Sequence, residues 1–155
     1  MVENDYLKNF IDRVQSVLQE NLISLYIIGS LSLEDYSEDH SDIDIFGITS
    51  RTLTDIERDQ LADVLDSTNF HCPSKGLDVV LLSKHNIKNI SPQPKFEFWY
   101  STGAEWPKEK WEKGANTEMI IFIELCRQNG IKIFGEELKF GTISNKLILD
   151  ALKHI

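Results

Sequence analysis

Apolar residues follow two different spacings along the chain, and their order predicts a small mixed α/β or α+β domain. Helical spacing predicts four amphipathic helices, over residues 4–19, 54–67, 117–129 and 144–155. Short apolar runs and one alternating segment predict five strands, over residues 22–28, 42–49, 77–83, 95–100 and 131–134. Residues 85–94 predict a loop, and residues 101–114 have no regular period. Helices therefore flank a small mixed sheet.

The length of the chain predicts one domain. With 155 residues it can bury a sizeable core, and it contains no internal repeat, low-complexity tract or interdomain linker. The apolar content of 41% and the charged content of 26% are ordinary for a folded protein. We therefore expect a single domain over residues 1–155.

Charge and cysteine content narrow the range of partners and compartments. The net charge of -9 argues against nucleic-acid binding, which depends on Lys and Arg neutralising phosphates. Cys72 and Cys126 are too few for a disulfide framework, so we expect the reducing cytoplasm. No apolar run approaches the ~20 residues that span a membrane, and the N-terminus lacks the pattern of a signal peptide. We expect no membrane association.

Two aspartates stand together on the second predicted strand. Asp42 and Asp44 are two residues apart, so their side chains point to the same face of a strand. Neighbouring carboxylates on an apolar strand repel each other unless a positive charge lies between them. Asp78 is the only charge in residues 77–83, another buried strand. If these two strands are adjacent, three carboxylates converge at one face of the sheet.

Such a group of carboxylates suits Mg²⁺, which prefers hard oxygen ligands together with water and substrate phosphate. The turn at Gly29 and Ser30 is predicted beside it, where glycine permits close approach of a phosphate and serine supplies donors. Mg²⁺ and a triphosphate at one site are the requirements of nucleotidyl transfer. The residues themselves therefore favour this chemistry.

The same residues resemble a known pattern. Gly29-Ser30, then Ser41-Asp42-Ile43-Asp44-Ile45, then Asp78 on a later strand are similar to the nucleotidyltransferase superfamily of DNA polymerase β. Residues 76–82, 96–106 and 116–135 further resemble one branch, the aminoglycoside 3″-adenylyltransferases of the streptomycin/spectinomycin type. The resemblance covers residues 22–135 and implies the palm-like nucleotidyltransferase fold.

The resemblance also implies roles for individual residues. Asp42 and Asp44 match the Mg²⁺ ligands. Asp78 matches a position that is commonly Glu in the branch, where the acid is the third ligand and the base toward the substrate hydroxyl. The shorter Asp leaves its role as base more open than its role as ligand. The remaining matches are nucleotide-phosphate contacts at Gly29, Ser30 and Ser41, and an antibiotic contact at Trp106.

These roles imply a Mg²⁺-dependent enzyme that moves AMP from ATP, or another nucleotide from its triphosphate, to a hydroxyl of a small molecule such as an aminoglycoside-like antibiotic. The branch carries a second, helical C-terminal domain, whereas this sequence ends at Ile155. Residues 144–155 are then either part of the single domain or the stub of a missing helical domain. In the second case, another copy of the chain or a protein partner replaces that domain.

Two other functions stay open. The chain is alternatively a minimal nucleotidyltransferase or antitoxin that acts on a protein partner, or a non-catalytic nucleotide-binding module. Some residues also have two interpretations. Asp78 is alternatively a paired structural acid. Glu97 is expected on an exposed strand face, with a role as base as the alternative. Trp99, Trp106 and Trp111 are expected as core or interface aromatics, with substrate stacking as the alternative.

Overall fold

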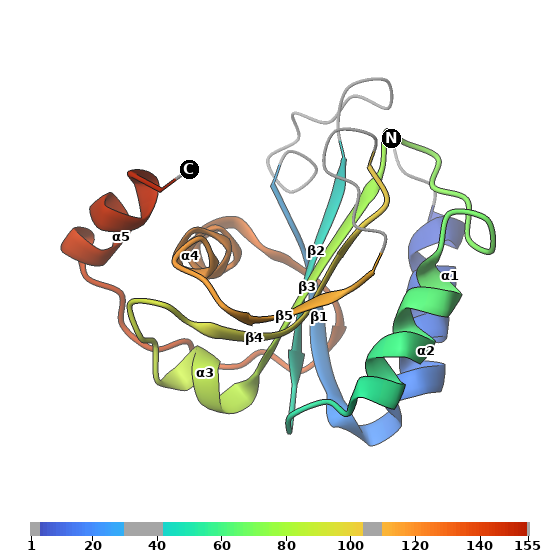
Figure 1. Cartoon of the computed structure of the whole chain (residues 1–155), viewed down its shortest axis with the longest axis horizontal. Coiled ribbons are helices and arrows are strands. Elements are labelled where there is room, and N and C mark those ends of the chain that lie inside the picture. The colour runs from blue at the N-terminus through green and yellow to red at the C-terminus, as the bar shows by residue number, and fades with distance from the viewer. Residues whose placement is uncertain (1–3, 30–41, 104–109, 155) are drawn as a thin grey trace.

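A six-stranded mixed sheet with helices on both faces forms the protein in the computed structural model, which describes residues 4–29, 42–103 and 110–154 (Figure 1). The helices are α1 Asn4–Leu18, α2 Asp55–Leu65, α3 Lys84–Lys88, α4 Met119–Asn129 and α5 Asn145–Leu152, and a 3₁₀ turn covers Gln19–Asn21. The strands are β1 Leu22–Ile28, β2 Ile43–Thr49, β3 Leu77–Ser83, β4 Lys95–Ser101, β5 Glu112–Ala115 and β6 Ile131–Gly135. Their order in the sheet is β5-β4-β3-β2-β1-β6.

One pair of strands in this described sheet differs from the others in direction. β2 and β3 are parallel, whereas β1–β2, β1–β6, β3–β4 and β4–β5 are antiparallel. The parallel pair is possible because α2 crosses from the end of β2 back to the start of β3. The predicted adjacency of these two strands is therefore confirmed, and it decides where the aspartates lie.

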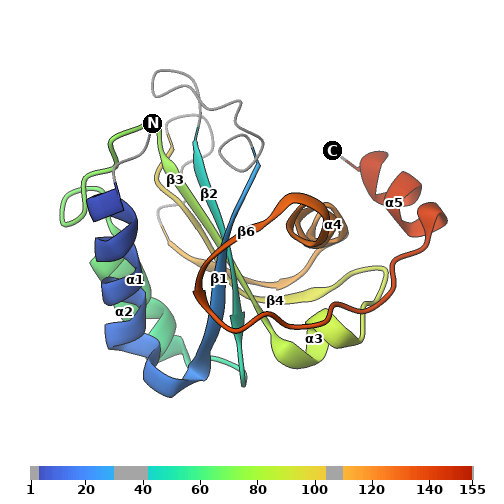
Figure 2. The ribbon, with the colours of Figure 1, turned by 180° about the vertical axis from the view of Figure 1, so that it is seen from behind.

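Each face of the sheet has its own core. α1 and α2 cover one face, and Figures 1 and 2 show both helices on the same side of the sheet. Their Phe10 and Leu61 are fully buried in one cluster with Ile45 and Leu81 of the central strands. α3 and α4 cover the other face. There the alternate strand residues Phe46, Ile48, Val80 and Leu82 form a second cluster with three helix residues, Ile87, Met119 and Ile123. Side chains alternate between the two faces along β2 and β3, so these strands contribute to both cores.

The helices and strands agree with the predicted pattern in their centres and differ at some ends. β1 and β3 have the predicted bounds. Ser144 caps α5 as its hydroxyl accepts a hydrogen bond from Leu147 N at 3.2 Å, but the helix ends at Leu152 instead of continuing. The first residues of the predicted loop 85–94 belong instead to the short helix α3, and residues 112–115 form the edge strand β5. No helix among the described residues is long and apolar enough to cross a membrane.

The prediction that Glu97 lies on an exposed face is wrong. The pairing of β4 with β5 shifts register between Phe96 and Trp99, so the strict alternation of faces fails there. Glu97 is fully buried under α2, where Arg58 Nη2 donates to its Oε1 at 2.8 Å and Arg58 Nε donates to its carbonyl oxygen at 2.6 Å. Leu53 N also donates to Oε1, at 2.9 Å. Glu97 is therefore a structural acid paired with Arg58.

Replacing Arg58 by Ala should destabilise the protein by about 3–5 kcal/mol, because it leaves the buried Glu97 carboxylate without its cation. Arg51→Ala is the matched control: Arg51 pairs with Glu57 at 3.0 Å, but its side chain is 57% exposed. Urea unfolding followed by circular dichroism measures both. Equal losses for the two variants would contradict a structural role of the buried pair.

Candidate functional site

The register of the parallel strands brings two of the predicted acids together. Asp44 on β2 is the direct partner of Asp78 on β3, and Ile28 of β1 is opposite Asp44 on its other side. Asp42 lies one residue before β2. Because side chains alternate, Asp42 and Asp44 belong to the face that carries Phe46. The site is therefore at the N-terminal end of the parallel pair, on the sheet face that α4 also covers.

Glycine backbone packs directly against these carboxylates. Gly29 follows β1 with a left-handed φ of 73°, and a Cβ at this position would lie 2.5 Å from Oδ2 of Asp44. A Cβ on Gly76 would lie 2.3 Å from Cα of Gly103 and 3.3 Å from Oδ1 of Asp42. Both positions thus need glycine, Gly29 for its conformation as well as for space. The predicted turn at Gly29 lies beside the acids.

Asp44 is partly buried and repelled by its neighbouring acids. Burial raises its pKa first, and the nearby charges of Asp78 and Asp42 raise it further, from 3.8 to about 7. The two causes act in the same direction, since low polarity and like charge both disfavour the carboxylate form. A divalent cation among these oxygens would offset that repulsion, so the donor set suits Mg²⁺ in its chemistry.

The aspartates do not form a closed cage. Within residues 4–29, 42–103 and 110–154, no group of three or more His, Cys, Asp or Glu side chains is arranged to hold a metal ion. Asp42 and Asp78 are nevertheless close enough to Asp44 for their charges to raise its pKa.

Asp78 has a partner that the sequence did not indicate. Trp99 of β4 donates its indole N–H to Oδ1 of Asp78 at 3.0 Å. Trp99 is directly opposite Val80, two residues beyond Asp78, so the contact is a diagonal one across antiparallel strands. The two sequence interpretations of Asp78, site acid and paired acid, are therefore compatible. Only the register of β3 and β4 could have pointed to Trp99.

Three predicted contacts lie outside the described residues, namely Ser30, Ser41 and Trp106. Their roles stay predictions. The other two tryptophans agree with the expected aromatic packing: Trp99 packs against the core under α4, and Trp111 packs against the core under α1 and α2.

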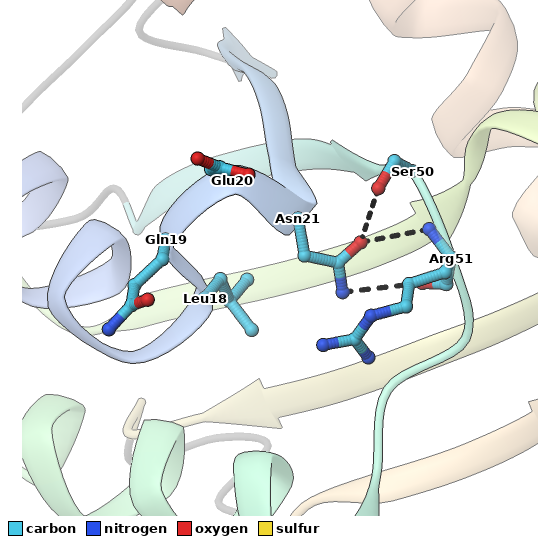
Figure 3. A pocket seen from close by; sticks show the side chains of 6 residues that line it. All are labelled: Leu18, Gln19, Glu20, Asn21, Ser50 and Arg51. Atoms are coloured by element: carbon cyan, nitrogen blue, oxygen red, sulfur yellow. Dashed lines mark hydrogen bonds between the residues drawn. The ribbon is translucent and has the colours of Figure 1, made fainter.

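A separate pocket lies at the other end of the sheet. It has a volume of about 380 Å³ and is lined by residues 18–21, Ser50 and Arg51 (Figure 3). Its central polar group, Asn21, accepts hydrogen bonds at Oδ1 from Ser50 Oγ and Arg51 N, both at 2.8 Å. These bonds tie the start of β1 to the chain after β2 (Figure 3). Asn21 thus joins two segments of the fold, and its Oδ1 is engaged by protein donors.

Comparison with known proteins places the fold. No family model matches the chain, and neither does any curated protein. Spectinomycin adenyltransferase AAD(9) from Enterococcus faecialis, solved with ATP and spectinomycin, matches with a TM-score of 0.79 and 17% identity. The match covers 99% of this chain and 65% of AAD(9), so the chain spans less than two thirds of that protein. The two share a nucleotidyltransferase fold, which confirms the predicted fold class.

Two further solved structures show weaker likeness. A toxin–antitoxin structure with AMP-PNP has a TM-score of 0.45 and 18% identity. The match covers 94% of this chain and 82% of the chain in that structure. A mutant of the toxin–antitoxin MntA-HpeT has a TM-score of 0.43 and 20% identity. This match covers 94% of this chain and 80% of the chain in that structure.

Asp44→Asn should stabilise the chelator-treated protein at neutral pH. The pKa of Asp44 is raised to about 7 in the folded state, so its contribution to stability is full below pH 4 and is lost as pH rises toward 7. Each pH unit in this window corresponds to about 1.4 kcal/mol of unfolding free energy. Above pH 7 the free energy of unfolding of the variant should therefore be roughly 2–4 kcal/mol larger than that of the wild type. Urea unfolding between pH 4 and 8 measures the difference.

The control for this comparison is Asp12→Asn, on the exposed side of α1. Because the Asp12 side chain is exposed, this variant should have a free energy of unfolding within about 0.5 kcal/mol of the wild type. If the unfolding free energies of the wild type and Asp44→Asn change in parallel with pH, Asp44 is not destabilised by burial beside Asp42 and Asp78.

Proposed function

We propose that the chain is a Mg²⁺-dependent nucleotidyltransferase that moves AMP from ATP to a hydroxyl group of a small molecule. The observation that carries the proposal is the in-register pair Asp44 and Asp78, with Asp42 close enough to add to the repulsion on Asp44. Partly buried carboxylates that lie next to one another destabilise the fold. Such unfavourable arrangements of charge are common at functional sites.

The three acids have different proposed roles. Asp42 and Asp44 hold the cation, and Asp78 completes the site. Mg²⁺ bound there supplies charge to offset the triphosphate. In the transfer step the acceptor oxygen forms a bond to the α-phosphorus, the bond from that phosphorus to the bridging oxygen breaks, and pyrophosphate leaves. The proton of the acceptor hydroxyl passes to a carboxylate oxygen of Asp78.

The neighbouring turn supports the nucleotide. Gly29 offers backbone without a side chain beside Asp44, which suits the close approach of phosphate. Ser30 and Ser41 are the predicted phosphate contacts, and Trp106 is the predicted acceptor contact. ATP is the first nucleotide to test because AAD(9) was solved with it, and spectinomycin is the first acceptor for the same reason. The net charge of -9 also favours a cationic acceptor.

Transfer of AMP to a protein partner is the second candidate. The last helix favours it, because Leu149 and Leu152 of α5 are 60% and 50% exposed. Large apolar side chains that face water on one helix are typical of a surface that meets another protein. The exposed helix concerns only the identity of the acceptor. The proposed chemistry of Asp42, Asp44 and Asp78 is the same for a protein and for a small molecule.

Pyrophosphate release tests the reaction. Wild-type protein with ATP and Mg²⁺ should release pyrophosphate when spectinomycin, an aminoglycoside or another hydroxyl compound is present. Intact mass should show the acceptor heavier by the mass of one adenylyl group. Asp44→Asn should lower the rate at least about 100-fold while the protein stays folded, because a cation ligand is lost. Asp12→Asn should keep the wild-type rate.

Each other result separates the alternatives. Modification of a co-purified protein instead of a small molecule would favour the second candidate. Thermal stabilisation by ATP, without release of pyrophosphate from ATP in the presence of any acceptor, would indicate a non-catalytic nucleotide-binding module. Full activity of Asp44→Asn would remove the three-acid assignment.

A further inference from the structure

We infer that Trp99 is a positioning residue of the proposed site: its indole N–H holds Oδ1 of Asp78 and thereby fixes the carboxylate beside Asp44. The inference rests on the proposed function, in which Asp78 is the third acid. It adds a residue from β4, a strand that carries none of the acids proposed for the reaction.

The geometry of the hydrogen bond limits how Asp78 moves. A carboxylate that accepts a bond at one oxygen keeps its plane and its two torsions close to one arrangement, so its second oxygen has a defined direction. The bond of 3.0 Å joins a neutral donor to a carboxylate, and indole nitrogen donates only. Trp99 therefore orients the acid without supplying a charge that would compete with a cation.

The indole ring is itself held by aromatic neighbours on two elements. Phe96 of β4 and Phe122 of α4 each meet it edge to face, with centroids 5.7 Å away and interplanar angles of 88° and 76°. Such contacts favour one ring orientation, because the positive edge of one ring meets the negative face of another. The direction of the N–H is thus set by packing that reaches from the sheet to α4.

This arrangement is what outer-shell support of a ligand requires. A residue that hydrogen-bonds a ligating carboxylate and is locked by packing typically contributes 10–100-fold to cation affinity or activity. A purely structural indole–carboxylate bond would contribute to stability but not to cation affinity. The two roles are therefore distinguishable by measurement.

The chain contains a matched control. Trp111 also donates its indole N–H to an aspartate, Oδ1 of Asp59, at 2.7 Å, but this pair lies on the α2 side of the sheet. Trp99→Phe and Trp111→Phe each remove one indole–carboxylate bond and keep an aromatic ring. A change that is specific to Trp99→Phe then reports on Asp78 rather than on the loss of a tryptophan.

The test measures Mn²⁺ binding by electron paramagnetic resonance, with and without ATP, and steady-state pyrophosphate release. Trp99→Phe should weaken Mn²⁺ binding 10–100-fold and lower kcat by a similar factor, with KM for ATP within about threefold of wild type. Trp111→Phe should match the wild type in each. Equal Mn²⁺ affinities for the two folded variants would overturn the inference and leave the proposed function intact.

A second measurement needs no variant of Trp99. In the wild type with ¹⁵N-labelled indoles, added Mg²⁺ should shift the Trp99 side-chain signal and leave that of Trp111 unchanged. An unshifted Trp99 signal in protein that binds Mg²⁺ would overturn the inference. Wild-type protein that binds neither Mn²⁺ nor Mg²⁺ would overturn the proposed function first, and the inference with it.

Discussion

The parallel pairing of β2 with β3 is the constraint on which the site depends. It sets Asp44 directly opposite Asp78, and the apolar side chains on the opposite face keep the register in place. Ile45 and Val79 are buried against α1 and α2, so a slip by one residue would turn carboxylates into that core. The hydrophobic packing of one face thus holds together like charges that would otherwise separate.

Two partly or fully buried acids in this sheet have opposite surroundings. Glu97 lies against Arg58 and is a structural ion pair between β4 and α2. Asp44 has carboxylates as its charged neighbours, and these raise its pKa. A buried acid with a cationic partner is explained by the fold alone, whereas an acid among acids needs a positive charge from outside it. This contrast, more than burial, separates the structural acid Glu97 from Asp44, the acid proposed to bind the cation.

Much of the fold was predictable from the sequence, because the central strands are continuous apolar runs with clear ends. β1 and β3 have the predicted bounds, and Asp78 was recognisable as a lone charge in a buried strand. Contacts between distant segments were not. Glu97 pairs with Arg58 across 39 positions, and the irregular register of β4 changed the face on which it lies. A period-two pattern cannot reveal such an irregularity or name its partner.

The same limit applies to the acid itself. The resemblance implies Glu at the position of Asp78, and the shorter side chain reduces the reach of the carboxylate. In the sheet, however, a short carboxylate stays close to its own strand, where an indole two positions along the neighbouring strand can meet it. The aromatic packing of Trp99 with Phe122 then connects α4 to the acid. Side-chain length and neighbouring donor are thus one structural solution, in which orientation comes from β4 and α4 and the carboxylate from β3.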